Sequence, residues 1–473
     1  MMFRFLPLGG GGEIGANCYY LNISGTGIIL DCGMHPQKIG LEALPRFDLI
    51  KDEPIDYVLI SHAHQDHLSS LPFLVQKFPY VKIVTTPQTR ALAELTLHDS
   101  ISILKEQLNE STYRSGKSDN FKPEAYQPLT EKIYSHEEID LLIQSIEYRA
   151  YKEEFFLEGY KHNLNSPVKA SFHDAGHILG SAGILLEFEG GNIFYSGDIK
   201  LDKQAIMNEA QLPSGKINTL ILETTYGRTD STTLLSWEKE TERFALEANK
   251  ILNAGGSILI PVFSLGKTQE VLATIWKLIL KGKLTQTDIY TGGIGAKISR
   301  VYDYTRYVVD MQNPEFELKS ALQKNLYDVE NIENFFKSPS IVLASSGMML
   351  EKTASFKLAK RWIKQENSAI FTVGFMEQST PGYRFANAVK GSKIRIYESD
   401  KEVEVRCTIK NFRFTSHAKR ESLLEIVKRL KPENVILVHG DAASINWVGA
   451  SILKDNKAVK VFSAEIGKEI NII

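Results

Sequence analysis

The sequence has few cysteines, no long uncharged hydrophobic run and little net charge. Its three cysteines, Cys18, Cys32 and Cys407, are too few for a disulfide framework, and none has the spacing of a metal site. No apolar run is long enough to cross a bilayer, and glycines interrupt the first residues before a signal-peptide core could form. We therefore expect a cytoplasmic protein without a membrane partner.

The charge balance excludes one class of nucleic-acid-binding protein. The chain carries 55 lysines and arginines against 57 aspartates and glutamates, a formal net charge of −2. A protein that coats nucleic acid is strongly basic, so any nucleic acid bound here must contact a local cleft. With 473 residues, 43% of them hydrophobic, the chain is long enough for two domains with sizeable cores.

A dense group of potential metal ligands follows an apolar strand near the N-terminus. Four such residues occur within six positions: His62, His64, Asp66 and His67. A predicted strand at 56–60 precedes them and helix-like spacing at 68–78 follows, so they lie on a loop at the carboxyl end of a strand, where α/β proteins bind ligands. Imidazoles and carboxylates suit zinc or a similar divalent ion. Because four ligands so close in sequence cannot easily surround one tetrahedral ion, we expect two neighbouring ions.

Further polar residues follow other predicted strands. Asp31 follows GTGIIL, His177 lies in the glycine-rich DAGHILGSAG, and Asp198 follows GNIFYSG. The pattern HxHxDH at 62–67, preceded by Asp31 and followed by His177 and Asp198, resembles the metallo-β-lactamase superfamily. The resemblance implies an α/β fold of the αββα sandwich type and a hydrolytic metal centre.

The resemblance divides the expected metal ligands into two groups. One ion is held by three imidazoles, those of His62, His64 and His177. The other ion is held by Asp66 and His67, and Asp198 bridges the two ions. Asp31 orients a ligand histidine from outside the coordination shell. The implied cofactors are two zinc ions, with manganese as the alternative.

The second half of the chain alternates strand-like and helix-like segments. GGSILIPVF, SIVLASSGMM and SAIFTVGF read as strands, and TQEVLATIWKLIL reads as a helix. Such alternation predicts a mainly parallel α/β layer. A unit of this kind inserted into a metallo-β-lactamase fold is similar to the β-CASP nucleases, which include the RNase J group and the endonuclease of pre-mRNA 3′-end processing. We expect the metallo-β-lactamase domain at 1–225 and 385–473, and the inserted β-CASP domain at 226–384.

The β-CASP resemblance adds three residues to the site. Glu223, His417 and His439 match the motifs that this family calls A, B and C. The match implies that His439 completes the ligands of the second ion and that Glu223 pairs with His417 near the leaving oxygen. A carboxylate beside an imidazole favours imidazolium, which can donate a proton. Asp198 is the candidate proton acceptor.

The inserted domain also contains candidate phosphate contacts. These are Lys267, Ser346, Gly347 and Arg384. The segment SLGKT around Lys267 is no Walker A loop, because Pro261 stands where that motif requires glycine.

The implied function is hydrolysis of phosphodiester bonds in single-stranded RNA by a zinc-dependent, two-metal ribonuclease. Cleavage is endonucleolytic, 5′-exonucleolytic or both. The histidine at motif C, His439, resembles the RNA-processing branch, since the DNA-repair branch typically has valine there. Three alternatives stay open: a DNA nuclease of the same family, a small-molecule metallo-hydrolase and a nonhydrolytic RNA-processing scaffold. The sequence also leaves the oligomeric state open, a homodimer included.

Overall fold

The boundary between the two parts of the chain falls later than the sequence suggested. The computed structural model describes residues 3–38, 40–114, 134–158, 168–374, 376–396 and 401–472. The chain divides into unit 1, which is Met1–Asp202, Glu209–Ser231 and His417–Ile473, and unit 2, which is Lys203–Asn208 and Thr232–Ser416. Residues 385–416, expected in the first domain, thus belong to unit 2. The reason is that β19 (Thr408–Phe412) pairs in parallel with β16 (Ala369–Val373) in that unit's sheet.

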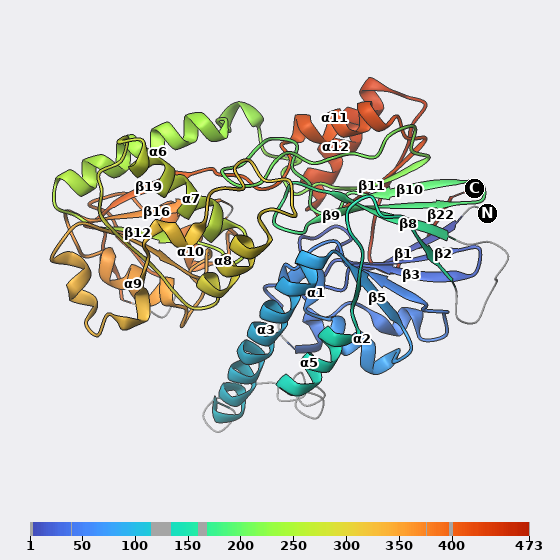
Figure 1. Ribbon diagram of the computed structural model, residues 1–473, viewed down its shortest axis with the longest axis horizontal. Helices are drawn as coiled ribbons and strands as arrows, with labels where there is room; N and C mark the ends of the chain where they lie inside the picture. Colours follow the sequence, from blue (N-terminus) through green and yellow to red (C-terminus); the bar gives the residue numbers. More distant parts are fainter. Residues whose placement is uncertain are drawn as a thin grey trace. The chain divides into compact units, whose positions relative to one another are not determined.

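Unit 1 contains two seven-stranded sheets (Figure 1). The first has the order β22 (Ile470–Ile472), β1 (Phe3–Gly9), β2 (Cys18–Ile23), β3 (Thr26–Leu30), β4 (Tyr57–Leu59), β5 (Lys82–Thr85) and β6 (Glu147–Tyr148). The second has the order β21 (Lys460–Ser463), β20 (Asn434–Val438), β11 (Thr219–Glu223), β10 (Gly191–Tyr195), β9 (Ala182–Phe188), β8 (Val168–Asp174) and β7 (Phe155–Leu157). Strands β3 to β6 are parallel, as are β10, β11, β20 and β21.

The two sheets of unit 1 share an apolar core. Strand β11 shows how alternation along a strand divides its side chains between two layers. Ile221 lies in the core shared by both sheets, whereas Leu220 and Leu222 pack on the other face against α11 (Arg420–Leu430) and α12 (Ala442–Asp455). Four further helices lie beside the first sheet (Figure 1): α1 (Gln65–Leu68), α2 (Leu71–Lys77), α3 (Pro87–Arg114) and α5 (His136–Ser145). The predicted αββα layering is confirmed.

Unit 2 is built on a six-stranded parallel sheet. Its order is β14 (Lys324–Asn325), β13 (Asp288–Thr291), β15 (Ser340–Ala344), β12 (Ile258–Pro261), β16 and β19. Strands β12, β15 and β16 are buried along their whole length, which is why they read as continuous apolar runs. The helices are α6 (Trp237–Asn253), α7 (Lys267–Leu280), α8 (Ile294–Thr305), α9 (Ala354–Trp362) and α10 (Pro381–Ala386). Strands β17 (Lys393–Ile394) and β18 (Val403–Glu404) pair separately.

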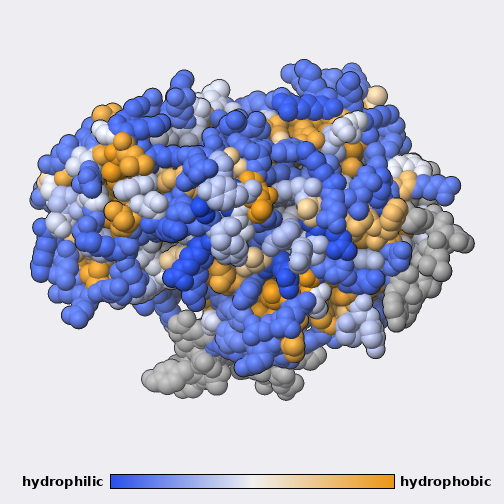
Figure 2. All heavy atoms as spheres, viewed as in Figure 1, coloured by the Kyte–Doolittle hydropathy of each residue, from blue (hydrophilic) through white to orange (hydrophobic). Residues whose placement is uncertain are grey.

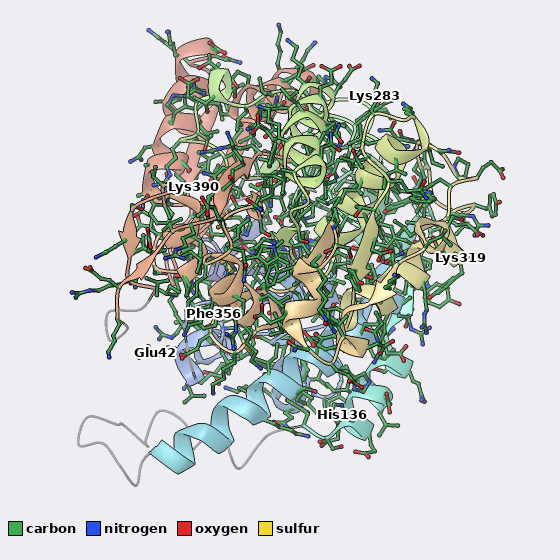
Figure 3. All side chains as sticks on the ribbon, turned by 90° about the vertical axis from the view of Figure 1, so that its left-hand side faces the viewer. Glu42, His136, Lys283, Lys319, Phe356 and Lys390 are labelled. Carbon is green, nitrogen blue, oxygen red and sulfur yellow. The ribbon has the colours of Figure 1, made fainter. Side chains whose placement is uncertain are left out.

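Aromatic side chains pack on the sheet of unit 2. On one face, Phe244 of α6 meets Phe371 and Phe412 edge-on, with ring centroids 5.7 and 5.2 Å apart. Another cluster joins β12, β15 and β16 to α9, which carries Phe356 and Trp362 (Figure 3 labels Phe356). The core of unit 2 therefore depends on large rings contributed by α6 and α9.

The visible surface is mostly polar. Hydrophilic residues cover most of the face shown in Figure 2, with smaller apolar areas between them. Across the described part of the chain, no helix combines the length and the apolar character that a membrane crossing requires.

Truncation of Trp362 should destabilise unit 2. Its indole is 0% exposed, lies 4.6 Å from the ring of Phe336, and donates a hydrogen bond to the Ser257 carbonyl at 3.2 Å. We expect Trp362→Ala to lower the free energy of unfolding by about 3–5 kcal/mol, measured by urea denaturation. Val389→Ala, at an exposed position, should change it little. Equal effects of the two substitutions would contradict the assigned core.

Candidate metal centre

The predicted site residues of unit 1 lie at the carboxyl ends of its strands. Asp31 follows β3, Asp198 follows β10, and Glu223 ends β11. Because neighbouring strands here are parallel, their carboxyl ends meet at the same edge of a sheet. The structure brings nine predicted residues into three groups, of which the first and third share Asp198. They are His62, His64, His177 and Asp198; Asp66, His67 and His439; and Asp198, Glu223 and His417.

The first group is formed by three imidazoles. The Nδ1 atom of His64 lies 3.1 Å from the Nε2 atom of His62 and 3.1 Å from the Nε2 atom of His177. His62 and His177 are buried. Three ring nitrogens that converge at this spacing are the donor set that a zinc ion takes in many hydrolases.

The second group combines Asp66 with two imidazoles. The Asp66 Oδ2 atom lies 3.2 Å from His439 Nε2 and 3.7 Å from His67 Nε2. His439, which lies 373 residues from Asp66 in the sequence, reaches this position from the turn after β20. Its backbone φ is 49°, a left-handed conformation that is uncommon for residues other than glycine.

Asp198 lies between the two groups. Its Oδ2 atom is 3.5 Å from His62 Nε2 and 3.6 Å from His177 Nε2. Its Oδ1 atom is 3.3 Å from both His67 Nε2 and His439 Nδ1. That oxygen is buried and makes no well-aligned hydrogen bond with any described residue. A buried anionic oxygen without such a bond, ringed by imidazoles, fits a bound divalent metal ion.

The electrostatics of the cluster favour the forms that bind cations. Burial by itself would raise the pKa of the Asp198 carboxyl, but the imidazoles of His439, His67 and His417 hold it well below its ordinary value. Burial, with the neighbouring His67, lowers the pKa of His62 well below its ordinary value. Asp198 is therefore ionised and His62 neutral, as metal ligands must be.

His67 has the opposite shift. Burial acts to lower its pKa, but the carboxylates of Asp198, Asp66 and Asp31 together raise that pKa well above its ordinary value. Without a metal ion, an imidazolium at His67 balances part of the negative charge. A metal ion must displace that proton, so binding at this group is linked to pH.

Asp31 fixes the orientation of the His67 ring. Its Oδ2 atom lies 2.7 Å from His67 Nδ1, which leaves His67 Nε2 directed toward Asp198. Asp31 also accepts hydrogen bonds from the Ser61 amide at 2.7 Å, the Ser61 hydroxyl at 2.8 Å and the Tyr195 hydroxyl at 2.6 Å. This is the carboxylate–histidine arrangement that orients metal ligands. The sequence analysis missed Ser61 and Tyr195, which belong to no recognised motif.

Two further residues that the sequence analysis missed shape the loop at 62–67. The Asn17 side-chain nitrogen lies 2.9 Å from His67 Nε2, and the Asn17 amide donates to the Asp66 carbonyl at 2.8 Å. A β-carbon at Gly33 would lie 1.6 Å from the Asp66 carbonyl oxygen. Only glycine therefore allows the segment after β3 to pass this close to the ligand loop.

The third group pairs Glu223 with His417. The His417 Nδ1 atom lies 3.2 and 3.3 Å from the two Glu223 oxygens. The Glu223 carboxylate is fixed by hydrogen bonds from the Ile199 amide at 2.9 Å and the Thr225 amide at 3.3 Å. Burial acts to lower the pKa of His417, but Glu223 and Asp198 raise it above its ordinary value. The pair therefore presents an imidazolium beside the metal ligands.

The four candidate phosphate contacts belong to unit 2. The Lys267 ammonium is 7% exposed and donates to the Phe414 carbonyl and, at 2.7 Å, to the Ser416 hydroxyl. The Arg384 guanidinium donates to the Ile396 carbonyl at 2.8 Å. The Ser346 carbonyl accepts a hydrogen bond from the Ser355 hydroxyl. Gly347 packs beside the Phe263 ring. All four have contacts within unit 2, and their role toward phosphate stays a prediction.

Three family profiles match successive parts of the chain. The metallo-beta-lactamase superfamily matches residues 11–239, the Beta-Casp domain matches residues 268–385, and the Zn-dependent metallo-hydrolase RNA specificity domain matches residues 402–463.

Curated relatives match along nearly the whole chain. Cleavage and polyadenylation specificity factor subunit 3 of Dictyostelium discoideum is 28% identical over 98% of this chain and 56% of its own length. Endoribonuclease YSH1 of Saccharomyces cerevisiae is 27% identical over 98% of this chain and 58% of its own. Cleavage and polyadenylation specificity factor 73 of Drosophila melanogaster is 28% identical over 97% of this chain and 62% of its own. The chain thus spans little more than half the length of these relatives.

A solved structure shares the fold. A protein of unknown function from Enterococcus faecalis superposes with a TM-score of 0.55 at 14% identity, covering 99% of this chain and 100% of that one. Profile matches, relatives and fold agree with the ligand pattern of unit 1 and the parallel sheet of unit 2. The chain belongs to the metallo-β-lactamase superfamily, in the group that carries a β-CASP domain.

Proposed function

We propose that the chain is a metal-dependent ribonuclease that cleaves phosphodiester bonds of single-stranded RNA internally, with two zinc ions as cofactors and manganese as the alternative. The observation that carries this proposal is the Glu223–His417 pair beside Asp198, on a site with two groups of metal ligands. A small-molecule hydrolase has no need of such a pair near the leaving group. The Saccharomyces cerevisiae relative is named an endoribonuclease, which supports RNA as the substrate.

Metal ions bound by these ligands would contribute to hydrolysis in two ways. Divalent ions in such a site polarise a phosphoryl oxygen and lower the pKa of a water molecule. Asp198 is placed to hold both ions, since each of its oxygens faces one group of imidazoles. Its lowered pKa makes the carboxylate a weak base, so holding cations is its main role and accepting a proton is secondary.

His417 is the proposed proton donor to the leaving oxygen. Its Nδ1 atom faces Glu223, which leaves Nε2 as the ring nitrogen that can donate to substrate. The side chain is 20% exposed, whereas Glu223 is buried, so the imidazole can be reached while its partner stays shielded. Glu223 both orients the ring and favours its protonated form.

Cleavage of RNA should depend on Asp198 and His417. With zinc-loaded protein and a 5′-labelled single-stranded RNA, we expect His417→Ala to slow cleavage about 10²- to 10⁴-fold, the usual contribution of a general acid. Asp198→Ala should abolish cleavage. The control Glu425→Ala changes an exposed carboxylate on α11 and should keep full activity.

The same assay separates the alternatives. Internal products from RNA but not from a matched DNA support the proposal. Release of the labelled 5′ nucleotide alone would indicate 5′-exonuclease action in place of internal cleavage. Equal cleavage of DNA would favour a general nuclease. If the RNA stays intact although the protein carries its full metal content, the remaining alternatives are a small-molecule hydrolase and a nonhydrolytic scaffold.

Metal content should follow the ligand set. Mass spectrometry of the metals should find two divalent ions per chain, and His439→Ala should lose about one of them together with activity, because His439 faces only the second group. His98→Ala removes an imidazole outside these groups and should keep both ions. A single ion in the unsubstituted protein would contradict the two-ion proposal.

The pH profile should report the Glu223–His417 pair. A general acid is active in its protonated form. This form is present below the pKa of the group and is lost as the pH rises through that pKa. Because Glu223 raises the pKa of His417, Glu223→Gln should lower that pKa and shift the alkaline limb of the rate toward lower pH. An unmoved alkaline limb would show that His417 does not donate the proton.

A further inference from the structure

The outward face of α8 in unit 2 has an unusual composition. The inner face is held against α7 by Gln269, whose side chain donates to the Gly295 carbonyl at 3.1 Å and to the Ser299 hydroxyl at 3.2 Å. The outward face presents Lys297, Arg300 and Tyr304, all exposed. Their spacing of three and four residues places them in one line along the helix, which we call the α8 strip.

The two cations of the α8 strip have no partners among the residues that the structure describes. Neither the Lys297 ammonium nor the Arg300 guanidinium makes an ion pair, hydrogen bond or ring contact there. The acidic residue of α8, Asp303, is turned inward and accepts hydrogen bonds from the amides of Leu318 at 2.6 Å and Lys319 at 3.0 Å. The strip therefore presents positive charge that no carboxylate of its own helix offsets.

Exposed aromatic rings lie at both ends of α8. Tyr304 is 64% exposed near the C-terminal end. At the N-terminal end, Tyr327 is 62% exposed, and a β-carbon at Gly292 would lie 2.9 Å from its ring. A tyrosine ring combines an apolar face with a hydroxyl group, and such side chains are enriched at binding interfaces.

The α8 strip begins at the carboxyl edge of the parallel sheet. Helix α8 follows β13, and β13 is next to β15 and then β12 in the sheet. Ser346 follows β15 and Lys267 follows β12, so these two candidate phosphate contacts lie at the same edge as the start of α8. Ligands of open α/β sheets bind at this edge.

We propose that the α8 strip binds single-stranded RNA, with phosphates at Lys297 and Arg300 and a base stacked on Tyr304. The inference rests on the proposed ribonuclease function and adds a surface remote in sequence from the metal ligands. A single strand suits the strip because its phosphates match unpaired cations and its bases can stack on an exposed ring. Lys297 and Tyr304 are about 10 Å apart along the helix, at 1.5 Å per residue.

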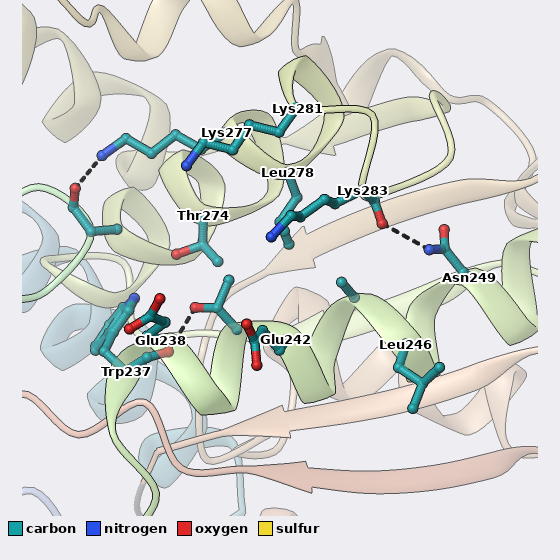
Figure 4. A pocket seen from close by; sticks show the side chains of 13 residues that line it. Trp237, Glu238, Glu242, Leu246, Asn249, Thr274, Lys277, Leu278, Lys281 and Lys283 are labelled. Carbon is teal, nitrogen blue, oxygen red and sulfur yellow. Dashed lines mark hydrogen bonds between the residues drawn. The ribbon is translucent and has the colours of Figure 1, made fainter.

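Another surface of unit 2 lacks this combination. The groove between α6 and α7 has a volume of about 470 Å³ (Figure 4). Its charged lining residues are Lys277, Lys281 and Lys283 on α7 and the turn after it, and Glu238 and Glu242 on α6. Carboxylates facing lysines give this groove mixed charge, which does not attract a polyanion. Lys281 and Lys283, both exposed, are therefore matched controls for the cations of the α8 strip.

The test is RNA binding by fluorescence anisotropy, with a fluorescein-labelled 12-nucleotide oligouridylate and Asp198→Asn protein to prevent cleavage. Lys297→Ala combined with Arg300→Ala should weaken binding about tenfold and reduce the slope of log affinity against log salt by about 1.4, or 0.7 per phosphate contact. Tyr304→Ala should weaken it about 5- to 150-fold, and Tyr304→Phe should restore it. Lys281→Ala combined with Lys283→Ala should leave the affinity unchanged.

A second readout separates this inference from the proposed function. Each substitution is also placed in the unsubstituted background, where hydrolysis of bis(p-nitrophenyl) phosphate reports the metal centre without RNA. Full hydrolysis with weakened RNA binding supports the α8 strip. If all strip variants bind and cleave RNA as well as the parent protein does, the proposal that the α8 strip binds RNA is wrong, while the proposed ribonuclease function stands. A parent protein that neither binds nor cleaves RNA would overturn both proposals.

Discussion

The buried carboxylate of Asp198 is the group on which the site of unit 1 depends. An ionised carboxylate away from water is costly unless positive charge or hydrogen bonds surround it. Here imidazoles from separate segments, among them His62, His67 and His439, approach its two oxygens. The imidazoles of His439, His67 and His417 keep Asp198 ionised by holding its pKa below the ordinary value. The histidines that compensate this buried charge therefore also surround the place where a cation would bind. A bound divalent ion would complete the compensation that the histidines begin.

The sandwich of unit 1 makes this arrangement possible because strands end together. Strands are rigid, so residues at their carboxyl ends are placed by the sheets and not by the loops themselves. The ligand loop at 62–67 is further fixed by neighbours: Asp31 holds His67, and Gly33 allows close approach of the backbone. Positive φ angles at Asp31 and His439 show that the backbone is also constrained where it carries site residues.

Unit 2 has a different physical task. Its parallel sheet buries β12, β15 and β16 completely, and some of its cations are engaged internally, as Lys267 is with Phe414 and Ser416. A chain with a net charge of −2 cannot attract a polyanion as a whole. For the RNA substrate proposed above, attraction must come from places where cations form no ion pair with described residues, as exposed Lys297 and Arg300 do.

The ligand types, their order and the strands that carry them could be predicted from the sequence, because side-chain chemistry and apolar runs are local properties. It also indicated the inserted parallel layer. The groups that support the ligands, such as Asn17, Ser61 and Tyr195, became apparent in the folded chain, since these contacts join distant segments and have no motif. The fold revealed one further assignment. It also placed 385–416 with unit 2, because strand pairing, not composition, assigns β19 to a sheet.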